Sequence, residues 1–130
     1  IEAITKEWTS LGCEVKSLSL TSKSYRDKEI DQLLSWADII YVGGGDTISM
    51  MQTWKKYGVD EKLKQIYEKD SAVLTGISAG AICWFYCGHS DSEAWATGML
   101  DIFHMAYCPH YNEPGRNTFD QMMLEKKCLD

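Results

Sequence analysis

The stretch AVLTGISAG, residues 72–80, decides the fold class and the chemistry that this sequence favours. Residues 72–77 form a short apolar run that predicts a strand. The pattern Gly-x-Ser-x-Gly follows at residues 76–80 and opens a predicted helix. In that setting the serine stands on a sharp strand-to-helix turn, which lifts its hydroxyl clear of the sheet as a nucleophile. The alternative is a tight turn whose small residues serve packing alone.

Outside this stretch, helical patterns alternate with patterns typical of strands. We expect strands at residues 14–20, 38–42, 72–77 and 99–108, and helices at residues 1–11, 25–36, 47–57, 60–69, 79–87 and 116–127. This alternation predicts an α/β fold with a parallel sheet and helices on both faces. Ligands of such sheets bind beyond the carboxyl ends of the strands.

The composition is that of a globular domain without nucleic-acid or membrane partners. The 130 residues are 45% hydrophobic and carry 13 Lys+Arg against 19 Asp+Glu, a net charge of −6. The acidic balance argues against binding nucleic acid or an anionic membrane. No apolar run approaches the roughly 18 residues of a membrane-spanning helix. Five cysteines without a Cys-x-x-Cys pair favour a reduced, cytoplasmic protein.

A second motif, GGGDT at residues 43–47, directly follows the apolar strand pattern DIIYV. Its glycines expose backbone N–H groups that can form an anion nest, and one of them can join the N–H of Ala79 as an oxyanion donor. Asp46 or Thr47 can cap the next helix. The alternative is a nucleotide loop, but the glycine spacing fits neither common phosphate-binding pattern.

A serine nucleophile needs a neighbouring base and an acid that orients it. Among the three histidines, His110 has the best position, because CPHY at residues 108–111 follows a predicted strand. His89 lies in a polar loop and His104 inside a strand pattern. For the acid, Asp91 is the first choice, Glu93 the second and Asp101 the third.

The remaining candidates have two interpretations each. Arg116 can pair with a substrate carboxylate or simply begin a helix. Trp95 can line a substrate pocket or belong to the core. Cys83, Cys87 and His89 offer three metal ligands, short of the four that a structural zinc site needs. We therefore expect no metal and no organic cofactor.

Three motifs in this order and spacing, IIYVGGGDT, GISAGA and CPHY, resemble the dipeptidase E family of serine peptidases, the aspartyl dipeptidases. The resemblance runs over residues 37–111. It implies the class I glutamine-amidotransferase-like fold, a three-layer α/β sandwich with a mostly parallel central sheet. It also implies site roles: Ser78 as nucleophile, His110 as base, Asp91 or Glu93 as acid, Gly45 and Ala79 as oxyanion donors, and Gly44 at the substrate.

The sequence departs from the family at Asp46, where the family usually has Asn, and over residues 81–87. Family members also extend further at both ends. We therefore expect residues 1–130 to form a single α/β peptidase-like domain that is a fragment of a longer family domain and lacks terminal strands. Open sheet edges would allow pairing with a second copy, and so a homo-oligomer.

These observations favour a serine hydrolase of the peptidase type that cleaves short peptides through an acyl-enzyme. The alternative is a catalytically silent family member that binds a small molecule or a protein. Glutamine amidotransfer is disfavoured, because the nucleophile position holds Ser78 instead of cysteine. An esterase activity stays open.

Overall fold

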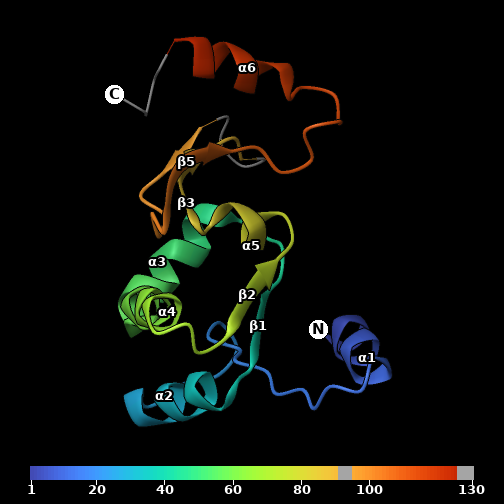
Figure 1. The fold of residues 1–130 in the computed structure, drawn as a ribbon, viewed down its shortest axis with the longest axis vertical. Coiled ribbons are helices and arrows are strands. Elements are labelled where there is room, and N and C mark those ends of the chain that lie inside the picture. The colour runs from blue at the N-terminus through green and yellow to red at the C-terminus, as the bar shows by residue number, and fades with distance from the viewer. Residues whose placement is uncertain (91–94, 126–130) are drawn as a thin grey trace.

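Short strands alternate with helices along the chain, as the sequence predicts (Figure 1). The computed structural model describes residues 1–90 and 95–125. The helices are α1 (Glu2–Ser10), α2 (Asp27–Trp36), α3 (Thr47–Tyr57), α4 (Val59–Glu68), α5 (Ala79–Ile82) and α6 (Asn117–Leu124). The strands are β1 (Ile39–Val42), β2 (Val73–Gly76), β3 (Phe85–Gly88), β4 (Ala96–Thr97) and β5 (Phe103–Tyr107).

The described strands form two small sheets instead of one continuous central sheet. β1 and β2 pair in parallel, with Val42 opposite Gly76 at their carboxyl ends. The second sheet has the order β4-β3-β5, in which β3 runs parallel to β5 and antiparallel to β4. The pairing is therefore parallel wherever a helix or long connection separates two strands, as expected for an α/β fold.

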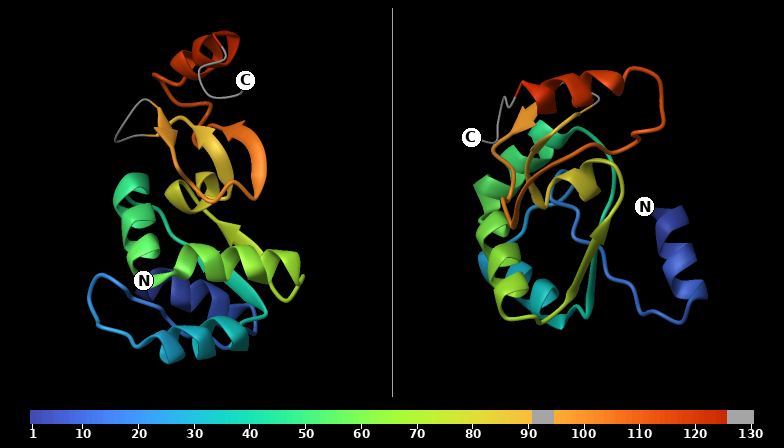
Figure 2. Two further views of the ribbon diagram at one scale, coloured as in Figure 1. Left: turned by 90° about the vertical axis from the view of Figure 1, so that its left-hand side faces the viewer. Right: turned by 45° about the horizontal axis from the view of Figure 1, so that its top comes forward.

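Helices cover both faces of the β1–β2 pair. In Figure 1 and in the right panel of Figure 2, α2, α3 and α4 lie on one side of it and α1 on the other. The core fills the side of α2, α3 and α4, where Ile30, Leu63, Ile82 and Leu100 are almost completely buried. α6 lies beyond the second sheet, at the opposite end of the molecule from α2 (Figures 1 and 2). Within the described residues, no helix is long and apolar enough to cross a bilayer.

The strand expected at residues 14–20 is wrong, because this segment pairs with none of the described strands. Its alternation places Leu18 and Leu20 against the core, which is enough to explain the pattern. The backbone turns directly afterwards, with the N–H of Ser22 donating to the carbonyl of Ser19. The N–H of Ser19 also donates to the hydroxyl of Tyr25. A loop can therefore satisfy both the apolar side chains and part of the backbone without a sheet.

The single helix expected at residues 79–87 is also wrong. α5 ends at Ile82, and Phe85–Gly88 form β3. Aromatic residues fit a pleated strand better than a helix, and the ring of Phe85 stacks on Tyr107 of β5. A Cβ on Gly88 would lie 1.9 Å from the carbonyl oxygen of Tyr107, so only glycine allows β3 to approach β5 here. Pairing with a distant strand decides this segment.

Candidate active site

Ser78 occupies the sharp turn between β2 and α5, in a backbone conformation that glycine prefers. Its φ is 57° and its ψ is −117°. The carbonyl of Ser78 accepts from the N–H groups of Ala81 and Ile82 at 2.9 and 3.1 Å, so this residue also begins α5. The side chain is partly exposed. The turn has the geometry that the Gly-x-Ser-x-Gly motif predicts for an elbow between strand and helix.

The two glycines of the motif allow the end of β1, the end of β2 and the start of α5 to meet. A Cβ on Gly76 would lie 2.1 Å from the carbonyl oxygen of Gly80. A Cβ on Gly80 would lie 2.0 Å from the carbonyl oxygen of Val42. Both distances are far shorter than a van der Waals contact, and the atoms that a Cβ would meet belong to the backbone. Glycine at both positions is therefore a packing requirement.

The glycine loop after β1 lies beside Ser78. A Cβ built on Gly44 would be 3.4 Å from the Cβ of Ser78 and 3.8 Å from its Oγ. Gly45 has a φ of +143°, which side-chain-bearing residues rarely adopt. Asp46 caps α3, since its carboxylate accepts from the N–H of Ser49 at 2.8 Å. Thr47, the alternative cap, is buried instead.

Two backbone N–H donors, those of Gly45 and Ala79, belong to the junction between the glycine loop and the start of α5. Ala79 is the first residue of α5, where a helix leaves its N–H groups without helical partners. Within the described part of the chain, no hydrogen bond occupies the N–H of Ala79 or that of Gly45. The positive end of a helix and a glycine loop at one point make the junction suitable for a negatively charged oxygen.

His110 lies after β5, as expected, in a turn of its own. Its φ is 56°, and its Nδ1 lies 3.4 Å from a carboxylate oxygen of Glu113. The N–H of Glu113 donates to the carbonyl of His110 at 2.9 Å. Sequence reasoning missed Glu113; the available signal was its spacing of three residues from His110 in a turn-rich segment. Among the described residues, no hydrogen bond joins Ser78 to His110.

The candidate acids differ in what the structure says of them. Asp91 and Glu93 lie outside the described residues. Asp101 has a φ of 54°, and its carboxylate lies 2.9 Å from Nδ1 of His104. Asp101 is therefore paired with a different histidine from the expected base.

Arg116 and His89 form a buried pair that sequence reasoning did not foresee. Both are less than a tenth exposed. The Arg116 guanidinium donates to Nδ1 of His89 at 2.5 Å, and Nε2 of His89 lies 2.8 Å from the hydroxyl of Thr118. The only sequence signal was a histidine two residues before Asp91. Arg116 does precede a helix, as one of its two interpretations requires.

Cys83, which directly follows α5, does not offer a second nucleophile at this site. Cys83 is fully buried, and burial raises the pKa of its thiol far above the usual range. Its Sγ donates to the carbonyl of Gly80. Among the described residues, no three His, Cys, Asp or Glu side chains gather closely enough to hold a metal ion.

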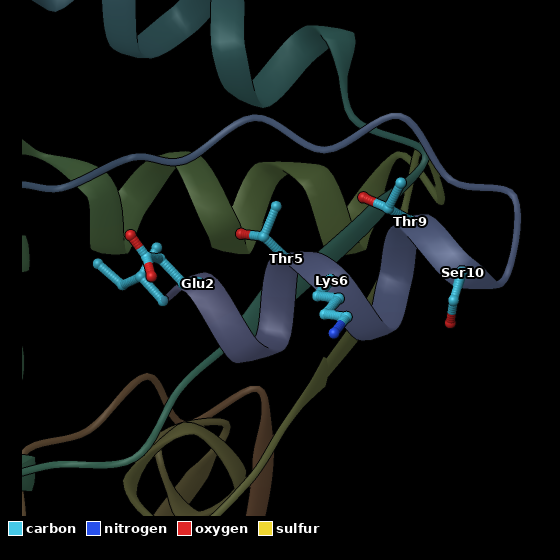
Figure 3. Close-up of a pocket in the computed structure, with 6 residues that line it drawn as sticks. Glu2, Thr5, Lys6, Thr9 and Ser10 are labelled. Atoms are coloured by element: carbon cyan, nitrogen blue, oxygen red, sulfur yellow. The ribbon is translucent and has the colours of Figure 1, made fainter.

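Two surface hollows lie away from Ser78. One runs along α1 and is lined by Ile1, Glu2, Thr5, Lys6, Thr9 and Ser10. Figure 3 shows that its labelled side chains all come from this one helix. The other is lined mainly by residues 70–74 and by Trp84, Ile102 and Phe103. Neither hollow includes Ser78, His110 or the glycine loop.

Comparison with known proteins identifies the family. Residues 1–128 match the model of peptidase family S51. The uncharacterized peptidase YgaJ of Bacillus subtilis is 34% identical over 99% of this chain and 56% of its own length. The uncharacterized peptidase Lmo0363 of Listeria monocytogenes is 33% identical over 86% of this chain and 58% of its own length. The chain thus spans little more than half the length of these curated relatives. On this evidence, the chain belongs to peptidase family S51, the dipeptidase E family.

Proposed function

We propose that this protein is a serine-type peptidase that cleaves short peptides. The observation that carries the proposal is Ser78 at φ 57°, held on a strand-to-helix turn with the glycine loop beside its hydroxyl. Backbone strain at a partly exposed serine is what a nucleophile elbow requires, and strain of this kind concentrates at functional sites. Membership of a peptidase family supports the same reaction class.

In the proposed reaction, Ser78 Oγ attacks the peptide carbonyl while His110 takes its proton. The N–H groups of Gly45 and Ala79 bind the resulting oxyanion. His110 then gives the proton to the leaving amine, and an acyl-enzyme remains. A water molecule loses a proton to His110 and attacks the ester, which releases the acid and restores Ser78.

The proposed acid is Asp91, with Glu93 as the alternative, because both follow the elbow in the sequence. An acid at Nδ1 would hold the imidazole in the productive tautomer. Glu113 is included in the mutational test because its carboxylate already lies 3.4 Å from that atom. Separate Asp91→Asn, Glu93→Gln and Glu113→Gln variants identify the acid: the largest loss of kcat should occur in Asp91→Asn.

At the substrate side, Gly44 leaves room for a peptide beside Ser78, since its missing Cβ would lie within 4 Å of the hydroxyl. Arg116 is proposed to bind a substrate carboxylate through its guanidinium group. An Arg116→Lys variant should then raise KM for peptides with a free carboxylate close to the scissile bond more than for amidated ones.

The wider setting is part of the same proposal. The two small sheets would belong to a three-layer sandwich in a single peptidase-like domain, which the helices on both faces of β1 and β2 support. The free thiols of Cys13 and Cys83 are compatible with the proposed cytoplasmic setting, whereas the disulfide bond of Cys87 is more typical of an oxidising compartment.

The experiment is labelling with a serine-directed fluorophosphonate, followed by intact-mass measurement and peptide mapping. We expect a single adduct on Ser78, with none on a Ser78→Ala variant. Ser35→Ala is the matched control, because Ser35 is an exposed serine on α2. A dipeptide library then gives the substrate class. Unchanged peptide turnover in Ser78→Ala would contradict the proposal.

The second candidate is a catalytically silent member that binds a small molecule or a protein. The observation in its favour is that the described residues contain no Ser78–His110 hydrogen bond. This candidate predicts no adduct and no turnover in a folded protein. Peptide binding measured by calorimetry, undiminished in Ser78→Ala, would then support it.

A further inference from the structure

Three successive residues at the start of α6 each contact a different part of the proposed site. Thr118, Phe119 and Asp120 lie in the first turn of this helix. Their partners are His89, Trp95 and Tyr111. His89 and Trp95 stand on either side of residues 91–94, and Tyr111 directly follows His110. One helical turn therefore contacts a described residue on each side of residues 91–94 in the sequence, and the neighbour of the proposed base.

The first contact is a directed chain of hydrogen bonds. A guanidinium can only donate, so Nδ1 of His89 accepts from Arg116. The proton of the neutral imidazole then sits on Nε2, which donates to the hydroxyl of Thr118 at 2.8 Å. Thr118 in turn donates to the carbonyl of Gly115 at 3.1 Å. Because His89 is buried, this chain fixes the ring and hence the chain segment before residue 91.

The second contact holds the other flank. The indole ring of Trp95 stacks on Phe119, with centroids 6.3 Å apart and an interplanar angle of 28°. The indole N–H is buried and has no hydrogen-bond partner among residues 1–90 and 95–125. The Phe119 ring is therefore a main determinant of where the Trp95 ring lies.

The third contact ties in the segment of the proposed base. Tyr111 packs edge-on against the same Phe119 ring, with centroids 6.2 Å apart. Its hydroxyl donates to the carboxylate of Asp120 at 2.7–2.8 Å. Phe119 thus contacts both Trp95 and Tyr111, which directly follows the proposed base.

We propose that the first turn of α6 is a positioning element, in which Thr118 and Phe119 hold His89 and Trp95, the described residues nearest in sequence to the proposed acid, relative to the segment of His110. The inference rests on the proposed function. A displacement of about 1 Å can cost roughly 100-fold in rate, so a common support for acid and base has direct catalytic value. None of the described residues of α6 is buried in the core. Its contacts therefore serve placement of these segments more than formation of the core.

The first test measures placement without needing activity. Thr118→Val removes the hydroxyl at nearly constant shape, and Phe119→Leu removes the ring. Gln121→Ala is the control on the same helix, since Gln121 is exposed and bonds only with Glu125 among the described residues. Amide hydrogen exchange should rise at least several-fold in peptides spanning residues 88–97 in the two test variants, and also in residues 108–112 for Phe119→Leu. Unchanged exchange in both variants would overturn the proposal.

The second test measures catalysis. We expect kcat to fall about tenfold or more in Thr118→Val and Phe119→Leu, with KM changed less than about threefold and a shifted pH profile of kcat. The control should match the wild type. Thermal melting of each variant shows whether it is folded. Raised exchange with unchanged kcat and pH profile would also overturn the inference.

The two proposals fail in different ways. If peptide turnover is the same in Ser78→Ala as in the wild type, the proposed function fails and takes with it the catalytic role of α6. If Ser78→Ala abolishes turnover while Thr118→Val and Phe119→Leu match the wild type in kcat, only the positioning role fails.

Discussion

Ser78 holds a backbone conformation that costs free energy in the folded protein. A non-glycine residue in a sparsely populated region costs about 1–3 kcal/mol, and Ser78 has φ 57° and ψ −117°. The backbone around this turn packs closely at Gly76 and Gly80, where a Cβ would not fit. The strained backbone of Ser78 and the close packing at the neighbouring glycines are therefore features of one turn.

Replacing Ser78 by glycine should relieve this strain. We expect Ser78→Gly to be about 1 kcal/mol more stable than Ser78→Ala, because alanine removes the hydroxyl but keeps the Cβ that makes the conformation unfavourable. The free energy of unfolding in urea measures the difference. Both variants should lack peptidase activity. Equal stability of the two variants would mean that the turn is not strained.

Gly80 should tolerate no side chain. A Cβ there would meet the backbone of Val42 at 2.0 Å, so Gly80→Ala must displace β1 from α5. We expect a loss of about 1–3 kcal/mol or more, as for overpacked cores, read as a lower urea midpoint. Gly43→Ala is the matched control, since nothing lies within 4 Å of a Cβ at Gly43. Similar losses in both variants would contradict the close approach.

At the scale of elements, α2 and α4 are joined by one lysine. Nζ of Lys62 lies 3.0 Å from Asp27 and 2.6 Å from Asp31, both on α2. The hydrogen bonds to Asp31 and then to Asp27 raise the pKa of Lys62. The lysine is mostly covered, whereas both carboxylates are well exposed. The two ion pairs of Lys62 therefore connect α2 and α4 at a site that is accessible to water and salt.

The contribution of Lys62 should be modest and pH-dependent. We expect Lys62→Met to lose up to about 1 kcal/mol at neutral pH, as for other exposed ion pairs. A raised pKa stabilises the fold below the unfolded value of about 10.4, and this contribution disappears as pH rises through the folded value. The difference in urea midpoint between wild type and variant should therefore close above about pH 10.4. A constant difference across that range would mean that packing of the lysine stem dominates.

Also at this scale, the boundary between α5 and β3 shows how a long-range contact overrides a local pattern. Residues 79–87 carry no local stop signal before Gly88 apart from poor helix formers. Strand formation at Phe85–Gly88 depends on pairing with β5. In this pairing Phe85 is opposite Phe103 and Gly88 is opposite Tyr107, which lie far along the chain. Such pairing is invisible to a periodicity argument over one segment.

For the whole molecule, the β1–β2 pair leaves apolar surface open. Ile39 and Val73, which are opposite each other in the register, are 42% and 64% exposed, and Ile77 beyond β2 is also exposed. Among the described strands, β1 and β2 each pair with one neighbour only. An uncovered edge with apolar side chains invites pairing with another chain, which supports the proposal of a homo-oligomer.

A charge at this surface should weaken self-association. We expect the wild type to sediment faster as its concentration rises, and Val73→Lys to remain slower under the same conditions because a lysine opposes edge pairing. Lys69→Ala is the control, since Lys69 is exposed at the end of α4 and lies outside the β1–β2 pair. A wild type that sediments as a monomer at all concentrations would contradict the homo-oligomer proposal.

The sequence by itself determined the parts of this protein that depend on local chemistry. Glycine spacing and an apolar run were enough to place Ser78 on its turn, because no other residues fit so close an approach. Helical periodicity was enough for α2, α3, α4 and their breaks, such as Gly58 with its φ of 70°. Family membership also followed from three short motifs.

Only the tertiary structure decided what depends on distant partners. It separated the strands into two sheets, ended α5 at Ile82 and left residues 14–20 as a loop. It also buried Arg116 against His89 and placed Glu113 beside His110. The physical reason is common to all these features. Strand pairing, burial and hydrogen bonding depend on groups that are far apart in the chain. A local sequence pattern can indicate that a segment needs a partner, but it does not identify that partner.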